Sequence, residues 1–344
     1  MTRSFRPSTL ADAPAILALF DAAGFHPFNS EPAHLHWKYW QPRADWPGSR
    51  SFVLADGSGV IAHTAVLPGS FLWGSQRVRT MQMSDWVARP GEGGAGVTLL
   101  KRLSQQTQAL ISIAGGALTL KIQPHLGFRP LGTATAYSRA LFPSRLLRVR
   151  TIPLWRRWPR FARSAVWALT APVAHRTNWT VRRIAADDLH RITSVLPRPA
   201  PAMGAFERSA ELFRYMLSCP IVPIALYSME RSERVQGYFL LAAAPSQVRI
   251  ADCWMDSADP ADWRAMISCA VEQARQDPHA VEVVTWANDP LLCGVLDQCG
   301  FHARFRVPVQ VRPADDASMP AALRVQMLDC DSVYLDTGQQ DLWA

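Results

Sequence analysis

The pattern of apolar and polar residues predicts the same series of elements twice along the chain. In each half, three strand-like runs are followed by a segment with helical spacing of its apolar residues. This pattern favours an α/β protein with a mixed (α+β) sheet in each half. The predicted strands are 51–55, 59–68, 76–87, 221–229, 235–243 and 247–255, and the helix of the second half is 261–275.

A glycine-rich loop separates the third strand from the first of these helices. Glycine occupies positions 91, 93, 94 and 96 of this loop. Such a loop turns tightly and aims N–H groups inward, at a helix end where the macrodipole is positive. It suits a phosphate or pyrophosphate, although a surface turn would need the same residues. The helix is expected to present one apolar face made by Val97, Leu100, Leu103, Leu110 and Ile111.

The loop matches neither common nucleotide-binding motif. A P-loop ends in Gly-Lys-Ser/Thr, whereas Gly96 is followed by Val97. A dinucleotide fingerprint needs an acidic residue about twenty positions further on, and no acid follows the loop before Asp187. The pattern therefore indicates a ligand that carries a pyrophosphate of another kind.

The two halves begin and end alike. Residues 4–12 resemble 180–188, and 125–129 resemble 298–302, at offsets of 176 and 173 residues. In both closing segments a glycine suited to a helix end precedes a strand-like run. We interpret this as an internal duplication. It predicts a first domain at residues 1–142 and a second domain at 178–313. A linker rich in Arg and Trp at 143–177 joins them, and a C-terminal extension covers 314–344.

Charge is distributed unevenly. From Gly93 to Ala186 there are fifteen Lys and Arg and no acid, while the rest of the chain has 21 basic and 28 acidic residues. The predicted linker could bind an anionic membrane surface, or it could be a connector that packs its Trp residues between the domains. No nucleic-acid recognition module is visible. The linker arginines are Arg145, Arg148, Arg150, Arg156, Arg157, Arg160 and Arg163.

Other features indicate a cytoplasmic protein without a metal. None of the six cysteines forms a Cys-x-x-Cys pair, which is typical of reduced thiols in the cytosol. No apolar run is long enough to span a bilayer, and acids interrupt the N-terminal apolar run. His34 and His36 alternate on what reads as a strand, but no cysteine pair accompanies them, so no metal site is predicted.

With these residues in view, the chain resembles the GNAT acyltransferase superfamily. The resemblance lies in Val87, Pro90, the loop 91–96 and Gly127-Phe128. The aromatic-basic run 37–40 (Trp-Lys-Tyr-Trp) is similar to a motif of GNAT-like proteins associated with exopolysaccharide genes. The resemblance covers the first half and, more weakly, the second. It implies tandem GNAT-like domains, of which the second is degenerate because Asp256 and Asp259 replace the glycine loop and would repel a pyrophosphate.

The resemblance implies binding of acetyl-CoA or another acyl-CoA. The pyrophosphate would bind the loop, and the pantetheine arm would pair with the preceding strand. The implied function is acyl transfer to an amine of a small molecule, such as an amino sugar; the alternative is a non-catalytic sensor or scaffold. The implied cofactor-binding residues are Trp86, Val87, Gly91, Glu92, Gly93, Gly94, Ala95, Gly96 and Val97.

The sequence departs from the family at the usual tyrosine acid, which is replaced by Gln123 in the first half and by Leu296 in the second. Acyl transfer to an amine needs a base and a proton donor. Asp85 could act as base, or be a strand acid paired with an arginine. His63 could also act as base, because the unperturbed pKa of histidine suits that role, or it could be a core histidine. Tyr137 could replace the missing acid, or only pack. The run 37–40 forms either a wall of the acceptor pocket or a core corner.

Overall fold

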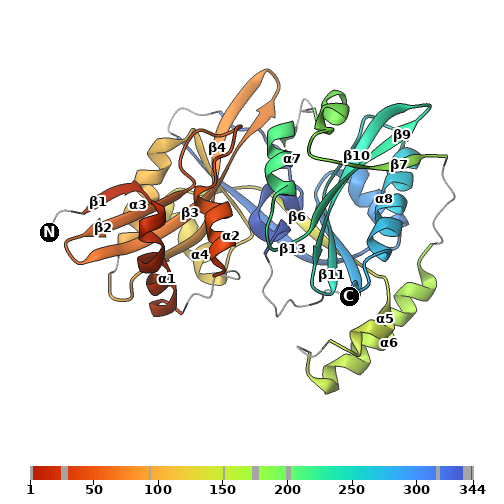
Figure 1. Ribbon diagram of the computed structural model, residues 1–344, viewed down its shortest axis with the longest axis horizontal. Helices are drawn as coiled ribbons and strands as arrows, with labels where there is room; N and C mark the ends of the chain where they lie inside the picture. Colours follow the sequence, from red (N-terminus) through yellow and green to blue (C-terminus); the bar gives the residue numbers. More distant parts are fainter. Residues whose placement is uncertain are drawn as a thin grey trace. The chain divides into compact units, whose positions relative to one another are not determined.

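The computed structural model describes residues 3–24, 30–92, 94–149, 152–172, 178–198, 203–314, 318–335 and 342 (Figure 1). Gly93 and Arg150, which the sequence analysis singled out, lie outside these residues. The predicted mixed α/β class is confirmed. The chain forms two compact units: the first contains residues 1–132, 199–207 and 308–323, and the second contains 133–198, 208–307 and 324–344.

The first unit is built on a sheet in the order β1-β2-β3-β4-β5-β13. Its neighbouring strands are antiparallel except for the parallel pair of β4 and β5. The short strands β8 and β14 pair with each other, and β8 also pairs with β3. The strands are β1 (Ser4–Pro7), β2 (Ser51–Asp56), β3 (Gly59–Trp73), β4 (Gln76–Ala88), β5 (Ala109–Ile113), β8 (Met203–Phe206), β13 (His302–Pro313) and β14 (Ala322–Arg324).

Both faces of this sheet are covered, because successive residues of a strand point to opposite sides. Val53 packs with α1, and its neighbour Leu54 packs in the cluster of α3. Contrary to the sequence-based expectation, Leu110 and Ile111 are not on the helix: α3 ends at Leu103, and the fully buried run from residue 109 to 113 forms β5. The helices are α1 (Ala13–Ala22), α2 (Pro32–Leu35), α3 (Ala95–Leu103) and α4 (Ala117–Ile122).

The second unit repeats the same sheet order, as β7-β9-β10-β11-β12-β6. Its one parallel pair is again the fourth and fifth strand, β11 and β12. The buried face of α8 packs into the largest core cluster. The elements are β6 (Arg129–Ala140), β7 (Thr180–Ile184), α7 (Ala210–Leu217), β9 (Ile224–Arg231), β10 (Arg234–Ala244), β11 (Gln247–Met255), α8 (Pro260–Arg275), β12 (Glu282–Ala287) and α9 (Pro290–Gln298).

The two halves of the sequence exchange strands. Residues 309–313 of β13, from the second half, pair with β5 in the first unit. Residues 135–140 of β6, from the first half, pair with β12 in the second unit. Each unit therefore takes its sixth strand from the other half of the chain. The predicted domains 1–142 and 178–313 describe the repeat in the sequence and remain a prediction.

The predicted linker contains α5 (Pro143–Leu146) and a longer helix, α6 (Leu154–Thr170), which continues through Pro159. Both belong to the second unit. Among the described residues, no helix is long and apolar enough to cross a membrane. His34 and His36 are not on a strand, since α2 contains His34 and a π-helical turn begins at His36.

Candidate functional site

A β-bulge marks the end of β4. Val87 lies opposite His63 and Ser84 lies opposite Ala65, so Asp85 and Trp86 together face one residue of β3. Asp85 has a φ of 50°, a conformation that Asp tolerates better than most residues do. The pairing of β4 with β5 ends at Gln82. The bulge therefore lies beyond the last residue of β4 that pairs with β5, and a bulge bends the strand and frees backbone groups from pairing.

The Asp85 carboxylate is held by two side chains from the π-helical turn His36–Trp40. Lys38 Nζ lies 2.6 Å from Asp85 Oδ2, and the Tyr39 hydroxyl donates to the same oxygen at 2.7 Å. Lys38 also donates to Ser84 Oγ at 2.9 Å. The Lys38 and Asp85 side chains are 6% and 8% exposed, so this ion pair is buried. Asp85 thus pairs with a lysine rather than with an arginine.

His63 connects the bulge to a row of hydroxyl groups. Its Nδ1 lies 3.2 Å from the Asp85 carbonyl oxygen, and its Nε2 lies 2.9 Å from Ser51 Oγ. Ser8 donates to Ser51, and the Trp40 indole donates to Ser8. A neutral imidazole with its proton on Nδ1 donates to the carbonyl and accepts from Ser51, which satisfies both nitrogens. His63 thereby orients the peptide group between Asp85 and Trp86.

Burial and neighbouring charges determine the protonation of these groups. Burial lowers the pKa of His63 to about 4, although the Asp85 charge and its carbonyl act in the opposite direction. Burial also lowers the pKa of His34 to about 3. Burial raises the pKa of Asp85, but the Lys38 charge and the hydrogen bonds from Lys38 and Tyr39 outweigh it, so the net pKa is lowered. At neutral pH the cluster therefore holds a neutral histidine and an ionised aspartate.

The glycine loop leads directly into α3. Gly91 and Gly94 have φ values of 85° and 86°, which favour glycine, and Gly94 is the N-cap of the helix. The first hydrogen bond of the helix runs from the Thr98 N–H to the carbonyl of the N-cap residue Gly94. The Glu92 and Ala95 N–H groups donate to the carbonyls of Arg89 and Glu92. The N–H groups of the first helical turn that have no partner within the helix lie at its positive end, which attracts anions. The one acid of the loop, Glu92, pairs with Arg3 at 2.8 Å.

Trp86 links the bulge to the loop. Its indole Nε1 donates to the Gly96 carbonyl at 3.1 Å. A Cβ on residue 96 would lie 3.2 Å from the same nitrogen, so glycine permits the close approach. The strand end and the first turn of α3 are consequently held together.

Tyr137 does not belong to the same compact unit as this cluster. It is on the part of β6 that belongs to the second unit, whereas Asp85 and His63 belong to the first. Burial raises the pKa of Tyr137, and a hydrogen bond with the Cys293 thiol raises it further. Gln123, which replaces the usual tyrosine acid, is fully buried and donates to Ser112 Oγ at 2.6 Å.

The second unit contains a related buried cluster. The register of β10 and β11 shifts at Ala251, next to Asp252. Asp252 pairs with Arg208 at 2.8 Å and accepts from the Tyr238 hydroxyl at 2.7 Å, so an aspartate beside a bulge again meets a cation and a phenol. Arg208 also contacts Asp329, whose pKa burial raises to about 6. The loop differs, since Asp259 caps its own helix by accepting from Ala261 N–H.

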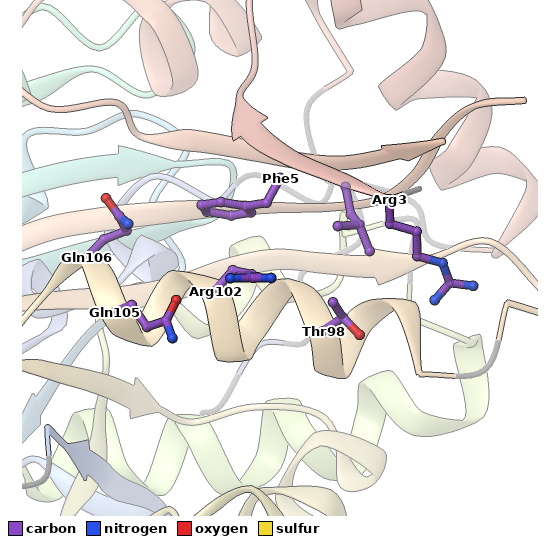
Figure 2. Close-up of a pocket in the computed structure, with 7 residues that line it drawn as sticks. Arg3, Phe5, Thr98, Arg102, Gln105 and Gln106 are labelled. Carbon is purple, nitrogen blue, oxygen red and sulfur yellow. The ribbon is translucent and has the colours of Figure 1, made fainter. Parts of the chain in front are cut away.

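A hollow of about 350 Å³ lies along α3 in the first unit (Figure 2). Phe5 and Leu54 contribute its apolar side. None of the three candidate catalytic residues lines it, and neither do the glycines of the loop. Its remaining lining residues are Arg3, Thr98, Arg102, Gln105 and Gln106.

Comparison with known proteins identifies the fold. No family of known proteins and no curated protein matches the sequence. A GCN5-related N-acetyltransferase from Anabaena variabilis is similar in structure, with a TM-score of 0.57 and 13% identity over 90% of this chain and 72% of that one. A probable N-acyltransferase from Enterococcus faecalis has a TM-score of 0.59 and 12% identity over 91% and 72%. N-myristoyltransferase of Saccharomyces cerevisiae, solved with bound myristoyl-CoA, has a TM-score of 0.62 and 12% identity over 90% and 78%.

The chain therefore has the GNAT fold of these acyltransferases. Within it, the sequence analysis named Asp85 and His63, which the structure brings together, but missed Ser8 and Ser51. The run 37–40 was recognised, yet the direct contact of Lys38 and Tyr39 with Asp85 was not. The sequence did contain one signal for this contact. Lys38 stands between aromatic residues, which favours its burial, and a buried lysine needs an acidic partner.

Proposed function

We propose that this protein is an acyl-CoA-dependent N-acyltransferase that acylates an amine of a small molecule. One observation carries the proposal: the bulge of β4, the glycine loop and the start of α3 form one continuous segment held together by Trp86. In this proposal the CoA pyrophosphate binds the N–H groups of residues 91–97. The pantetheine arm lies along Trp86 and Val87, and acetyl is the default acyl group.

The bulge has a chemical role in this proposal. Attack on a thioester places negative charge on the carbonyl oxygen, and a fixed backbone N–H can stabilise that charge. In a trans peptide the N–H of Trp86 points away from the Asp85 carbonyl. Because His63 holds that carbonyl, it also fixes the direction of the N–H. We therefore assign His63 as a positioning residue.

Asp85 is the proposed contact for the acceptor amine. Lys38 and Tyr39 both contact Oδ2, and in this proposal the ammonium group contacts Oδ1. A carboxylate with a lowered pKa is a weak base near neutral pH. Asp85 is therefore better suited to bind the ammonium group of the acceptor while the ammonium proton passes to water than to keep that proton itself. The role of Tyr137 as proton donor to the thiolate stays a prediction from the sequence.

Isothermal titration of CoA into Gly94→Glu tests the proposed cofactor site. A Cβ on Gly94 meets nothing within 4 Å, so the new side chain would not clash, and its negative charge at the helix N-cap would repel the pyrophosphate. Gly74→Glu is the matched control, because Gly74 also has a positive φ and open space but lies in the turn between β3 and β4. We expect only Gly94→Glu to lose binding. Unchanged CoA binding in Gly94→Glu would refute the site.

A non-catalytic CoA-binding sensor is the second candidate. It is favoured by the closed ion pair of Asp85 and by Gln123 at the usual tyrosine position. Thiol release from acetyl-CoA, measured with a panel of amines, distinguishes the two. Turnover that disappears in Gly94→Glu supports the enzyme, whereas CoA binding without turnover on any amine supports the sensor.

We also infer that the second unit is a degenerate copy that binds no CoA. Its matching strand order and its Asp252 cluster support a common origin. Asp259 already satisfies the start of α8, and its charge would repel a phosphate there.

A further inference from the structure

The outward face of α6 is apolar along its whole length. Of the eight large apolar side chains that are exposed among the described residues, five lie on this helix. Their spacing places them on one side, together with Ala162. They are between 57% and 86% exposed, and they are Leu154, Trp155, Trp158, Val166 and Leu169.

The opposite face attaches α6 to the second unit. Phe161 packs against a buried cluster that includes Leu146 and Val281. Ser164 is buried, and the Trp167 ring stacks on His302 at 4.0 Å. The helix is thus anchored through one face. Trp155 and Trp158 stay 70% and 63% exposed, although the Trp158 ring meets the edge of the Phe161 ring.

The charges around this helix identify what could cover its exposed face. α6 contains four arginines and no acid. Arg156 is exposed and lies 4.5 Å from the Trp155 ring, and Arg148 before the helix is also exposed. A second copy of this face would bring arginines together without compensating acids. An anionic lipid surface would supply both the negative charge and the apolar layer that Trp and Leu need.

We propose that α6 is a membrane-docking helix, which lies on an anionic bilayer with its exposed apolar face inserted among the lipids. Tryptophan suits the boundary between headgroups and acyl chains. Arg148 and Arg156 would contact lipid phosphates. The inference does not depend on the proposed acyltransferase activity.

Vesicle cosedimentation of the full chain tests this proposal. The probe is vesicles of equal parts phosphatidylcholine and phosphatidylglycerol, compared with pure phosphatidylcholine. Leu169→Glu should reduce partitioning about tenfold or more, because it removes a large apolar contact and adds a negative charge. Leu118→Glu is the matched control, since Leu118 is also an exposed leucine, 70% accessible, but is on α4. It should bind as the unmodified protein does.

Binding of the unmodified protein should favour the anionic vesicles and weaken with added salt. Three results would overturn the proposal: no binding to anionic vesicles, equal binding by Leu169→Glu, or equal losses in both variants. Analytical ultracentrifugation adds a further check. A dimer that is abolished by Leu169→Glu, without vesicle binding, would show that a second copy covers this face.

Discussion

The buried histidine of the bulge predicts a specific pH dependence of stability. His63 is fully buried, and its pKa falls from 6.5 to about 4 on folding. Between these values the unfolded chain binds a proton that the folded chain does not. Stability contributed by the neutral His63 is thus fully present above pH 6.5 and is lost as the pH falls towards 4. The complete loss corresponds to about 3 kcal/mol, of which about 2 kcal/mol is lost by pH 5.

Denaturant unfolding of the unmodified protein and of His63→Asn, across this pH range, measures the effect. The difference in unfolding free energy between the two proteins should shrink by about 2 kcal/mol from pH 7 to pH 5. His34 is present in both proteins, so its contribution cancels. His36→Asn is the control, because His36 is an exposed histidine on the same π-helical turn. A difference that does not change with pH would show that His63 is not held neutral by burial.

Three further predictions follow from the buried charges and the loop. Asp85→Ala should lower the free energy of unfolding by about 3–5 kcal/mol in denaturant unfolding, because Lys38 is left buried and unpaired. The double variant Lys38→Met, Asp85→Leu should regain most of this stability. Equal losses of stability in the single and the double variant would contradict this. Arg208→Met should lower the free energy of unfolding by about 3 kcal/mol or more. Arg77→Met, at an exposed ion pair, should lower it by under about 1 kcal/mol. Similar losses of stability in the two variants would be inconsistent with the burial of the Arg208 ion pair. Calorimetric titration should give one CoA per chain with salt-sensitive affinity, and two equivalent sites would refute the assignment to the first unit.

The sequence predicted those parts of the fold that depend on local pattern. The predicted strands correspond to β2, β3, β4, β9, β10 and β11, and the glycine turns at Gly127 and Gly300 have the expected positive φ. The contact between Lys38 and Asp85 could not be predicted, because it joins residues far apart through a π-helical turn. The predicted helix after the loop was too long, because the apolar spacing of Leu110 fits a helix and a buried strand equally well.

The partner of a strand is also not encoded in its pattern. The runs after Gly127 and Gly300 were expected to be strands, and they form β6 and β13. Their apolar residues do not specify which sheet they join. For α6, the composition indicated an arginine- and tryptophan-rich segment. Which face turns outward depends on the anchoring of Phe161 and Trp167.

The exchange of β6 and β13 has a consequence for synthesis on the ribosome. When the first half has emerged, its sheet still has β5 as an open edge, and an unpaired edge invites aggregation. The strand that closes it, Val309–Pro313, is made about two hundred residues after β5. We therefore expect the nascent first unit to remain incomplete, and open to chaperones, until β13 has been translated. A fragment that stops before β13 should be insoluble when it is produced alone.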